Sequence, residues 1–147
     1  MEAEERFDSL FAWYGKKYHV DAAWLKAQAI CESNLDPDAV SPVGAVGLTQ
    51  FMLRTWEEVA AALWHRPTLR TNPEKAIEAQ AYYMAGLGKL FEGDRLKSTA
   101  AYNCGQGRLN SILNQWGANW REMIPKETRD YLTRIEAQYA RLIKAEG

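Results

Sequence analysis

The sequence has little cysteine, almost no net charge and no long apolar run, and each shortage excludes a class of protein. Its two cysteines, Cys31 and Cys104, are too few to form the disulfide framework of a small secreted domain. A formal net charge of −1 argues against binding that depends on neutralising nucleic-acid phosphates. No stretch approaches the roughly 18 apolar residues that a membrane-spanning helix needs. We therefore expect free thiols, no nucleic-acid partner and no membrane span.

The first residues also lack the features of a secretory signal. Residues 1–6 are acidic and polar, with neither a positively charged start nor an apolar core. On this basis we expect that the protein is cytoplasmic, is exported by another route, or has been trimmed of its leader. The two histidines, His19 and His65, have no companions at the spacing of metal ligands, so the sequence predicts no metal site.

The residues that are present fit one globular domain over residues 1–147. Apolar residues make up 47% and charged residues 25% of a chain long enough to bury a single core. Six tryptophans and seven tyrosines are many for this length. They fit core packing, and they also fit a carbohydrate cleft in which flat rings stack on sugar faces. Their number alone does not decide between the two.

Apolar residues recur at helical spacing along almost the whole chain. Three helix starts are signalled by capping residues: Asp21, Thr55 with Glu58, and Asn72 before Pro73. The sequence contains no internal repeat, no linker and no sustained strand pattern. It predicts an all-α fold of seven or eight helices, mainly over residues 5–18, 22–33, 56–63, 73–90, 95–102, 109–116 and 126–145.

Residues 34–47, NLDPDAVSPVGAVG, form the one long stretch without a helical pattern. Two prolines and two glycines give it fixed turns, and Gly44 and Gly47 are candidates for a positive φ or a close backbone approach. Loops of this length inside a compact domain are usually functional or disordered. Four apolar residues favour a packed loop: Leu35, Val40, Val43 and Val46.

An acid stands directly before this loop. Glu32 falls in the last turn of the helix that begins after Asp21, since Pro37 and the turn-formers before it favour a helix end near Ser33 or Asn34. A helix C-terminus carries partial negative charge, so a structural glutamate is better placed at the other end. Apolar neighbours and a negative helix end should raise the pKa of Glu32, which suits a general acid working near neutral pH. Many helices also carry a solvated glutamate at this position, so placement alone leaves both readings open.

Four separated segments carry a more specific pattern. They are CESNLDPDAVSPVGAVGLTQFM (31–52), AAYNCGQGR (100–108), IP (124–125) and KETRDYLTRI (126–135). In this order and spacing they resemble the catalytic domain of soluble lytic transglycosylases, glycoside hydrolase family 23, which goose-type lysozymes also join. The resemblance covers the chain from about residue 7 to residue 135. It implies a lysozyme-like helical fold with a peptidoglycan cleft, and cleavage of the β-1,4 bond between N-acetylmuramic acid and N-acetylglucosamine without metal or cofactor.

The resemblance also assigns roles on the side of the cleft that follows the acid. Glu32 matches the catalytic acid and base, and Ser33 is the adjacent serine that orients either the carboxyl or the loop. The same match places three further residues in this wall, where they should contact substrate: Ser41, Gln50 and Met52. For Ser41, the plainer alternative is that it simply builds the loop together with the glycines.

On the opposite side, the resemblance implies that Tyr102 and Asn103 lie beside the acid. Glu127 and Tyr131 belong to the last helix, which closes the cleft and should also contribute to substrate binding. For Glu127 an ordinary structural role is an equal alternative, because acids are favoured in the first turn of a helix.

The sequence departs from the family pattern at three positions. Thr49 replaces a common methionine and should change the shape of one wall. Cys104 replaces a common alanine, and Cys31 stands beside the acid where a polar residue is common. In such a fold both cysteines lie near the site, so a disulfide is conceivable if their Cα atoms come within about 7 Å. We favour two buried, inert thiols.

The mechanism turns on whether a second carboxylate assists Glu32. Two-carboxylate glycosidases place the second acid across the bond. Asp36 and Asp38 are the only candidates nearby in sequence, and aspartates in such turns commonly bond backbone N–H groups. We therefore expect the single-carboxylate route that the resemblance implies, which ends in a 1,6-anhydromuramic acid. A goose-type hydrolase that uses water and an inactive cell-wall-binding module are the alternatives.

The expected partner is the glycan strand of peptidoglycan, and we expect a monomer. The site of action should be the periplasm or cell wall. A phage virion or lysis enzyme, a component of a secretion apparatus and a trimmed periplasmic enzyme all fit the sequence.

Overall fold

The computed structural model of the protein describes residues 3–146, and their regular secondary structure is helical throughout. The elements are η1 (Ala3–Glu5), α1 (Asp8–Tyr18), α2 (Ala22–Ser33), α3 (Leu53–Leu63), α4 (Pro73–Leu90), α5 (Arg95–Cys104), α6 (Gln106–Trp116), η2 (Gly117–Asn119), α7 (Trp120–Met123) and α8 (Lys126–Glu146). Strand-like pairing in this part of the chain is limited to isolated bridges of Val46 with Val40 and with Phe51. The all-α prediction is confirmed.

Two of the three predicted helix starts are confirmed. The carboxylate of Asp21 accepts hydrogen bonds from the backbone of Ala23 and Trp24 and caps α2. The side chain of Asn72 accepts from the backbone N–H of Lys75, with Pro73 as the first residue of α4.

The predicted capping box of Thr55 and Glu58 is wrong. Helix α3 begins two residues before Thr55, at Leu53, because the carbonyl of Met52 already accepts the first helical hydrogen bond from Trp56 N–H, at 3.0 Å. Both polar residues therefore lie inside the helix.

Other predicted boundaries shift by a few residues. Residues 3–5 form a separate 3₁₀ turn, so α1 begins at Asp8. Gly105, with φ of 92°, is the single residue between α5 and α6, so α6 begins at Gln106 rather than near Leu109.

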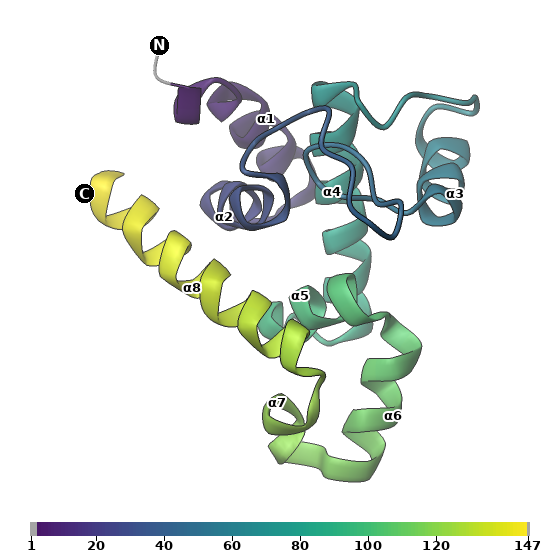
Figure 1. The fold of residues 1–147 in the computed structure, drawn as a ribbon, viewed down its shortest axis with the longest axis vertical. Helices are drawn as coiled ribbons and strands as arrows, with labels where there is room; N and C mark the ends of the chain where they lie inside the picture. The colour runs from purple at the N-terminus through teal and green to yellow at the C-terminus, as the bar shows by residue number, and fades with distance from the viewer. Residues whose placement is uncertain (1–2, 147) are drawn as a thin grey trace.

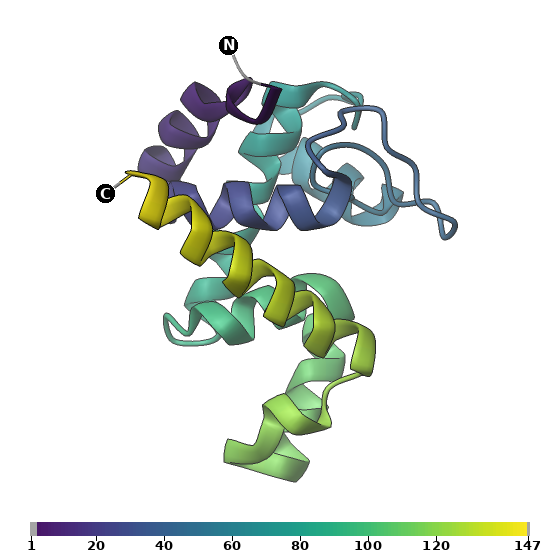
Figure 2. The ribbon, with the colours of Figure 1, turned by 60° about the vertical axis from the view of Figure 1, so that its left-hand side comes forward.

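Helix α2 lies at the centre of the packing. Figures 1 and 2 show α1–α4 in the upper part of the molecule, α5–α7 in the lower part, and α8 running between them. Helices α1, α4 and α8 all pack against α2, and α5 packs against α4 and α8. Fully buried apolar side chains fill these contacts, among them Leu25, Ala27, Ala29, Ile77, Leu132 and Ile135. None of the helices in the described residues is long and apolar enough to cross a membrane.

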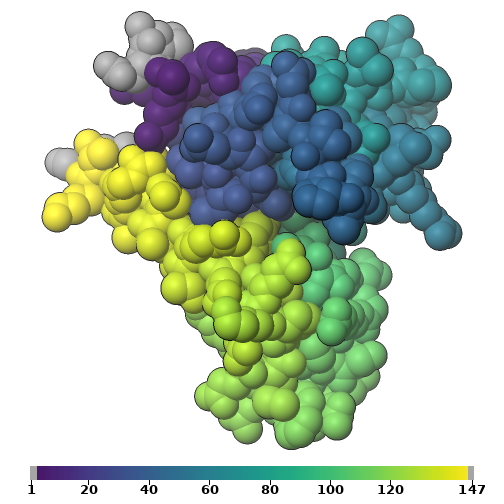
Figure 3. All heavy atoms as spheres, viewed as in Figure 1, coloured from purple at the N-terminus to yellow at the C-terminus, as the bar shows by residue number. Residues whose placement is uncertain are grey.

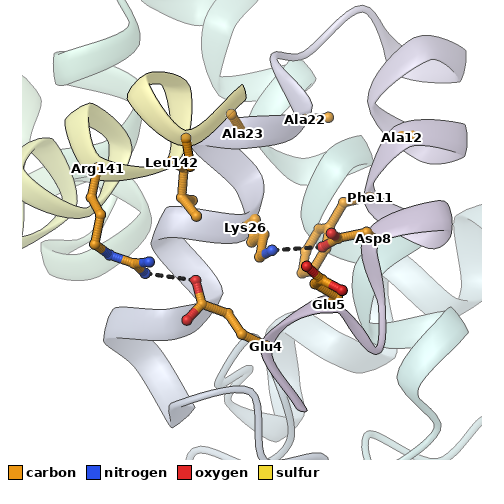
Figure 4. Close-up of a pocket in the computed structure, with 11 residues that line it drawn as sticks. Glu4, Glu5, Asp8, Phe11, Ala12, Ala22, Ala23, Lys26, Arg141 and Leu142 are labelled. Carbon is orange, nitrogen blue, oxygen red and sulfur yellow. Dashed lines mark ion pairs between the residues drawn. The ribbon is translucent and has the colours of Figure 1, made fainter. Parts of the chain in front are cut away.

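Ion pairs join α1 to α2 and α8 to η1 beside the first turns of α2. Figure 4 shows a pocket between α1, α2 and α8, bordered by two ion pairs. Lys26 pairs with Asp8 at 2.7 Å, and Arg141 pairs with Glu4 at 2.7 Å. This pocket lies beside the first turns of α2, at the opposite end of the helix from Glu32.

The loop after α2 is held mainly by hydrogen bonds. Ser41 Oγ accepts from the backbone N–H of Ala45 at 3.0 Å, and Gln50 Nε2 donates to the carbonyls of Ala39 and Gly47 at 3.2 and 2.9 Å. The prediction of a loop packed by its valines is wrong in part. Val40 and Val43 are 68% and 76% exposed, whereas Leu35 is buried.

Gly44 and Gly47 both have the predicted positive φ, at 91° and 92°. They differ in their surroundings. A Cβ atom on Gly47 would lie 2.2 Å from the carbonyl oxygen of Arg70, whereas nothing lies within 4 Å of one on Gly44. Arg70 in turn donates to the carbonyls of Gly44 and Phe51, at 3.1 and 2.9 Å. The 66–72 segment therefore lies directly against the loop at Gly47.

This difference predicts unequal effects of one substitution. Gly44→Ala should lower the free energy of unfolding by about 1–2 kcal/mol, the cost of left-handed backbone for a residue with Cβ. Gly47→Ala should lower it by about 1–3 kcal/mol more, because a backbone carbonyl must also move. Urea unfolding of both variants measures the two losses, and equal losses would contradict the close packing at Gly47.

Candidate active site

Glu32 lies in the last turn of α2, as the sequence predicts, and the chain turns sharply after it. Asn34 and Leu35 both adopt left-handed backbone, with φ of 54° and 60°. This conformation is tolerated by asparagine but strained for leucine. Burial of the Leu35 side chain and a 2.7 Å hydrogen bond from Arg6 to the Leu35 carbonyl hold it in place. The strained turn directs the loop back over the end of α2.

A chain of buried hydrogen bonds ends on the carboxyl of Glu32. Tyr131, on α8, donates from its hydroxyl to Glu32 Oε2 at 2.9 Å. Gln28 Nε2, one turn before Glu32 on α2, donates to the Tyr131 hydroxyl at 2.9 Å, and Gln80 Nε2 on α4 donates to Gln28 Oε1 at 3.0 Å. Tyr131 is 2% exposed and both glutamines are 0% exposed.

The two oxygens of Glu32 therefore have different surroundings. Oε2 is occupied by Tyr131. Within the described residues Oε1 has no hydrogen-bond partner, yet it is not among the buried atoms that lack one. Oε1 is thus the oxygen that solvent, or a ligand, can reach.

The pKa of Glu32 is raised to about 7, mainly by burial and to a smaller extent by the negative charge of Glu127. The hydrogen bond from Tyr131 and the positive charge of Arg134 act against this rise. The predicted direction is confirmed, and the main cause is removal of the carboxyl from water. A carboxyl with this pKa exists in both protonation states near neutral pH, as a group that first gives and then takes a proton requires.

A cluster of aromatic rings, with Phe51 buried, packs between the loop, α4 and α5. Phe51, Tyr83 and Tyr102 contact one another edge to face, with ring centroids 5.6 to 6.0 Å apart. The Tyr102 hydroxyl donates to the carbonyl of Thr49 at 2.8 Å and so joins α5 to the loop. Burial and then the charge of Glu32 raise the pKa of Tyr102 well above its usual value, so Tyr102 lies close to the acid and remains a neutral phenol.

Asn103 joins α5 to the start of α8. Its Oδ1 accepts from the hydroxyl of Thr128 at 2.8 Å, and Thr128 is buried. No partner within residues 3–146 accepts from the Asn103 amide N–H groups, and the side chain is half-buried, so these donors can serve a ligand. Glu127 is exposed in the first turn of α8, near enough for its charge to act on Glu32.

The polar residues expected in the loop wall act mainly on the loop itself. Ser33 Oγ donates to the carbonyl of Leu48 at 2.8 Å, so it orients the loop and not the carboxyl. Ser41 and Gln50 make the hydrogen bonds within the loop described above. Met52 is 47% exposed and presents an apolar surface. Figure 3 shows the molecular surface recessed between the upper part, which includes this loop, and the lower part formed by α5–α7.

Thr49 does not shape the wall as expected, because it is buried and its hydroxyl donates to the carbonyl of Ala76 on α4 at 3.2 Å. Cys31 and Cys104 are free thiols, each half-buried, and burial raises the pKa of both. Among the described residues no three His, Cys, Asp or Glu side chains gather as metal ligands would.

Sequence reasoning missed the residues that support Glu32 from behind. Gln28, Gln80 and Arg134 contact or influence the acid through the fold, and only Gln28 carried a local signal: a glutamine one helical turn before the acid on an otherwise apolar helix. Tyr131 was expected to bind substrate. Its burial and its bond to Glu32 place it behind the carboxyl, so we assign it the role of holding that group.

Comparisons with known proteins identify the family of this chain. The family described as "Transglycosylase SLT domain" matches residues 9–123. The chain is 35% identical over 131 residues to the "Peptidoglycan transglycosylase gp16" of Escherichia phage T7, covering 88% of this chain and 10% of that protein. It is 31% identical over 148 residues to the "Soluble lytic murein transglycosylase" of Escherichia coli, covering 91% of this chain and 23% of that protein.

Solved structures are similar over almost the whole chain. An inactive mutant of the lytic transglycosylase Slt from Pseudomonas aeruginosa superposes with a TM-score of 0.84 at 27% identity, covering 96% of this chain and 25% of that one. A complex of the 70-kDa soluble lytic transglycosylase with bulgecin A gives a TM-score of 0.90 at 27% identity, covering 97% of this chain and 25% of that one. The chain thus spans between a tenth and a quarter of the length of these relatives.

The raised pKa of Glu32 predicts a pH-dependent stability. Between the ordinary pKa of 4.5 and about 7 the folded chain holds a proton that the unfolded chain has lost, so stability falls as pH rises through this window. Glu32→Gln removes this loss, and the glutamine oxygen can still accept from Tyr131. The variant should match the wild type at pH 4 and exceed it above pH 7 by up to about 3 kcal/mol.

Urea unfolding at both pH values measures this difference. Glu57→Gln, which neutralises an exposed carboxylate on α3, controls for the loss of one charge. Equal stability of Glu32→Gln and wild type at pH 8 would show that burial of this carboxyl carries no cost.

Proposed function

This chain belongs to the transglycosylase SLT domain family, and from that premise we propose that it cleaves the β-1,4 bond between N-acetylmuramic acid and N-acetylglucosamine in peptidoglycan. The observation that carries the proposal is the Glu32 carboxyl, with a pKa of about 7, one oxygen held by Tyr131 and the other accessible. A group so arranged can donate its proton to a glycosidic oxygen and later recover one.

In the first step Glu32 protonates the oxygen of the leaving N-acetylglucosamine. Positive charge then develops at C1 of the muramic acid, and the N-acetyl group of the same sugar stabilises it. We expect the half-buried Asn103 amide and Tyr102 ring, on α5 beside the acid, to help position the sugars.

In the second step Glu32, now a carboxylate, takes the proton of the C6 hydroxyl, which attacks C1 and closes the 1,6-anhydro ring. Attack from within the same sugar is favoured over attack by water because the hydroxyl is already close and oriented. The burial that raises the pKa of Glu32 also makes its carboxylate a stronger base for this step.

Support for a single-carboxylate route comes from the other acids near the site. The Asp36 carboxylate accepts from the backbone N–H of Asp38 at 2.9 Å, the turn role expected for it, and both aspartates are exposed. Among the residues that the structure describes, Glu127 is the carboxylate whose charge acts on Glu32, and it lies in solvent at the start of α8.

We place this activity in the periplasm or cell wall, on glycan strands, with the domain working as a monomer. Support for a monomer is that α2, α5 and α8 of one chain supply Glu32, Asn103 and Tyr131. Relatives from a phage and from bacteria leave a phage enzyme, a secretion-apparatus component and a periplasmic enzyme as settings.

Glu32→Gln should lower the turnover of purified peptidoglycan about 10²–10⁴-fold while sedimentation with peptidoglycan is retained. The loss follows because an amide can neither give nor take the proton. Asp38→Asn, at an exposed position in the following loop, is the matched control and should keep activity. Unchanged lysis by Glu32→Gln would contradict the proposed role of Glu32, and a wild type that binds without turnover would indicate a cell-wall-binding module.

Mass spectrometry of the digest separates the two kinds of enzyme. The proposed route gives muropeptides that end in 1,6-anhydromuramic acid. A goose-type hydrolase gives reducing ends only, and this result would replace internal attack with attack by water.

Glu127→Gln tests for a second carboxylate. Removing its charge should lower the pKa of Glu32, so the alkaline limit of activity should move to lower pH while the maximal rate stays within about tenfold of wild type. Asp36→Asn should likewise keep the rate within about tenfold. A loss of more than about 10²-fold in either variant, the size expected for a lost catalytic group, would indicate a two-carboxylate mechanism.

A further inference from the structure

We propose that Gln28, oriented by Gln80, fixes the direction of the Tyr131 hydroxyl so that it always donates to Glu32 Oε2, which confines the acidic proton to Oε1. Gln28 and Gln80 would then be positioning residues for the reaction, acting through Tyr131. The proposal deepens the function proposed above and rests on it for its catalytic meaning, but the hydrogen-bond direction can be tested without any activity.

The direction begins at a backbone group that cannot be reversed. The carbonyl of Leu25 can only accept, and it accepts from Gln80 Nε2 at 3.0 Å. The same Nε2 donates to Gln28 at 3.0 Å, so Gln28 must present its oxygen there. The amide nitrogen of Gln28 therefore faces Tyr131, and it donates to the hydroxyl at 2.9 Å. One fixed acceptor thus orients both amides.

The orientation of the Gln80 amide leaves its oxygen without a hydrogen-bond partner. Its Oε1 is the one side-chain atom in the described residues that is buried without a hydrogen-bond partner. Rotating the amide by half a turn would instead place that oxygen against two acceptors, the Leu25 carbonyl and Gln28 Oε1. The observed orientation is therefore the less costly of the two, although it leaves one buried acceptor unpaired, which is unfavourable.

The single hydroxyl group of Tyr131 determines which oxygen of Glu32 carries the acidic proton. A phenol has a single proton to donate, and burial together with the charge of Glu32 keeps Tyr131 protonated. Within the described residues its hydroxyl contacts only Gln28 and Glu32. Because Gln28 already donates to it, the phenol proton has only Glu32 Oε2 as an acceptor. When Glu32 is neutral, its own proton therefore resides on Oε1, the accessible oxygen.

Several charged or titratable groups surround Glu32, and the test must distinguish their effects from that of the amides. On α8 these are Glu127, Tyr131 and Arg134; on α5, Tyr102; on α2, Cys31. Gln28 and Gln80 are neutral, so their replacement by a neutral residue changes no charge near the carboxyl. A shift in the titration of Glu32 on such a replacement reports the hydrogen-bond direction.

The test is the titration of Glu32 followed by NMR in protein labelled with ¹³C at the glutamate carboxyl carbon, with Glu32→Gln used to assign the signal. Gln28→Met keeps the side-chain length and frees Tyr131 to turn away or to accept from Glu32. The carboxylate then loses an obligatory donor, so the pKa of Glu32 should rise by about one unit. Gln80→Met, which removes only the orientation of Gln28, should raise it by less.

Two further variants make the result specific. Tyr131→Phe removes the donor itself and should cause the largest rise in the pKa of Glu32. Adding Gln28→Met to Tyr131→Phe should not raise this pKa further. Thr99→Val is the matched control, because Thr99 is fully buried and accepts a 2.9 Å hydrogen bond from Trp24 on α2 without touching the relay. It should lower stability and leave the Glu32 titration in place.

An unchanged or lowered titration in Gln28→Met would overturn the proposal, as would an equal rise in Thr99→Val. If Gln28→Met does not fold, as judged by circular dichroism, Gln80→Met decides in its place. With an active enzyme, the alkaline limit of kcat/KM should rise by the same amount as the titration in Gln28→Met. An inactive wild type whose titration still shifts as expected would refute the proposed function and leave the relay standing.

Discussion

The burial of one carboxyl at the C-terminal end of α2 is the constraint on which the rest of this site depends. Glu32 is placed where the loss of contact with water and the negative end of the helix dipole both oppose its charge, and its pKa rises to about 7. Such a group is tolerated only with a donor on it, and α8 supplies Tyr131 for this purpose. The packing of α8 on α2, through side chains such as Leu132 and Ile135, sets the position of that donor.

The two sides of the site are built from different materials. The polar side chains on the loop side form hydrogen bonds with the backbone of the loop after α2. These side chains are Ser33, Ser41 and Gln50. The exposed apolar surface of the loop includes Met52, whereas Phe51 of the same loop is buried in the core. The side formed by α5 and α8 keeps free amide donors at Asn103 and charge at Glu127. We therefore expect a glycan to make apolar contacts on the loop side and hydrogen bonds on the side of α5 and α8.

The sequence was informative wherever a local rule decides the structure. Helical periodicity, the caps Asp21 and Asn72, and the helix end after Glu32 are short-range properties, and the structure confirms them. The predicted capping box at Thr55 is wrong because α3 begins earlier, directly after Met52. Where α3 begins depends on how the chain leaves the preceding loop. The prediction that valines pack that loop is wrong in part for a related reason. Hydrogen bonds and the contact of Gly47 with Arg70 fix the shape of the loop, so it does not need Val40 and Val43 in its interior.

The support of Glu32 could not be read from the sequence, because its partners lie 52 to 103 residues apart along the chain. Glutamine is common on helices, so the place of Gln28 one turn before the acid is a weak signal, and Gln80 carries none. What distinguishes them is full burial combined with an orphaned oxygen on Gln80. A core selected for stability alone would satisfy that oxygen or replace the amide with an apolar group. The unpaired oxygen of Gln80, the buried acid Glu32 and the strained backbone of Leu35 each lower the stability of the fold around the C-terminal end of α2. Such losses of stability concentrate where a protein holds reactive groups in place.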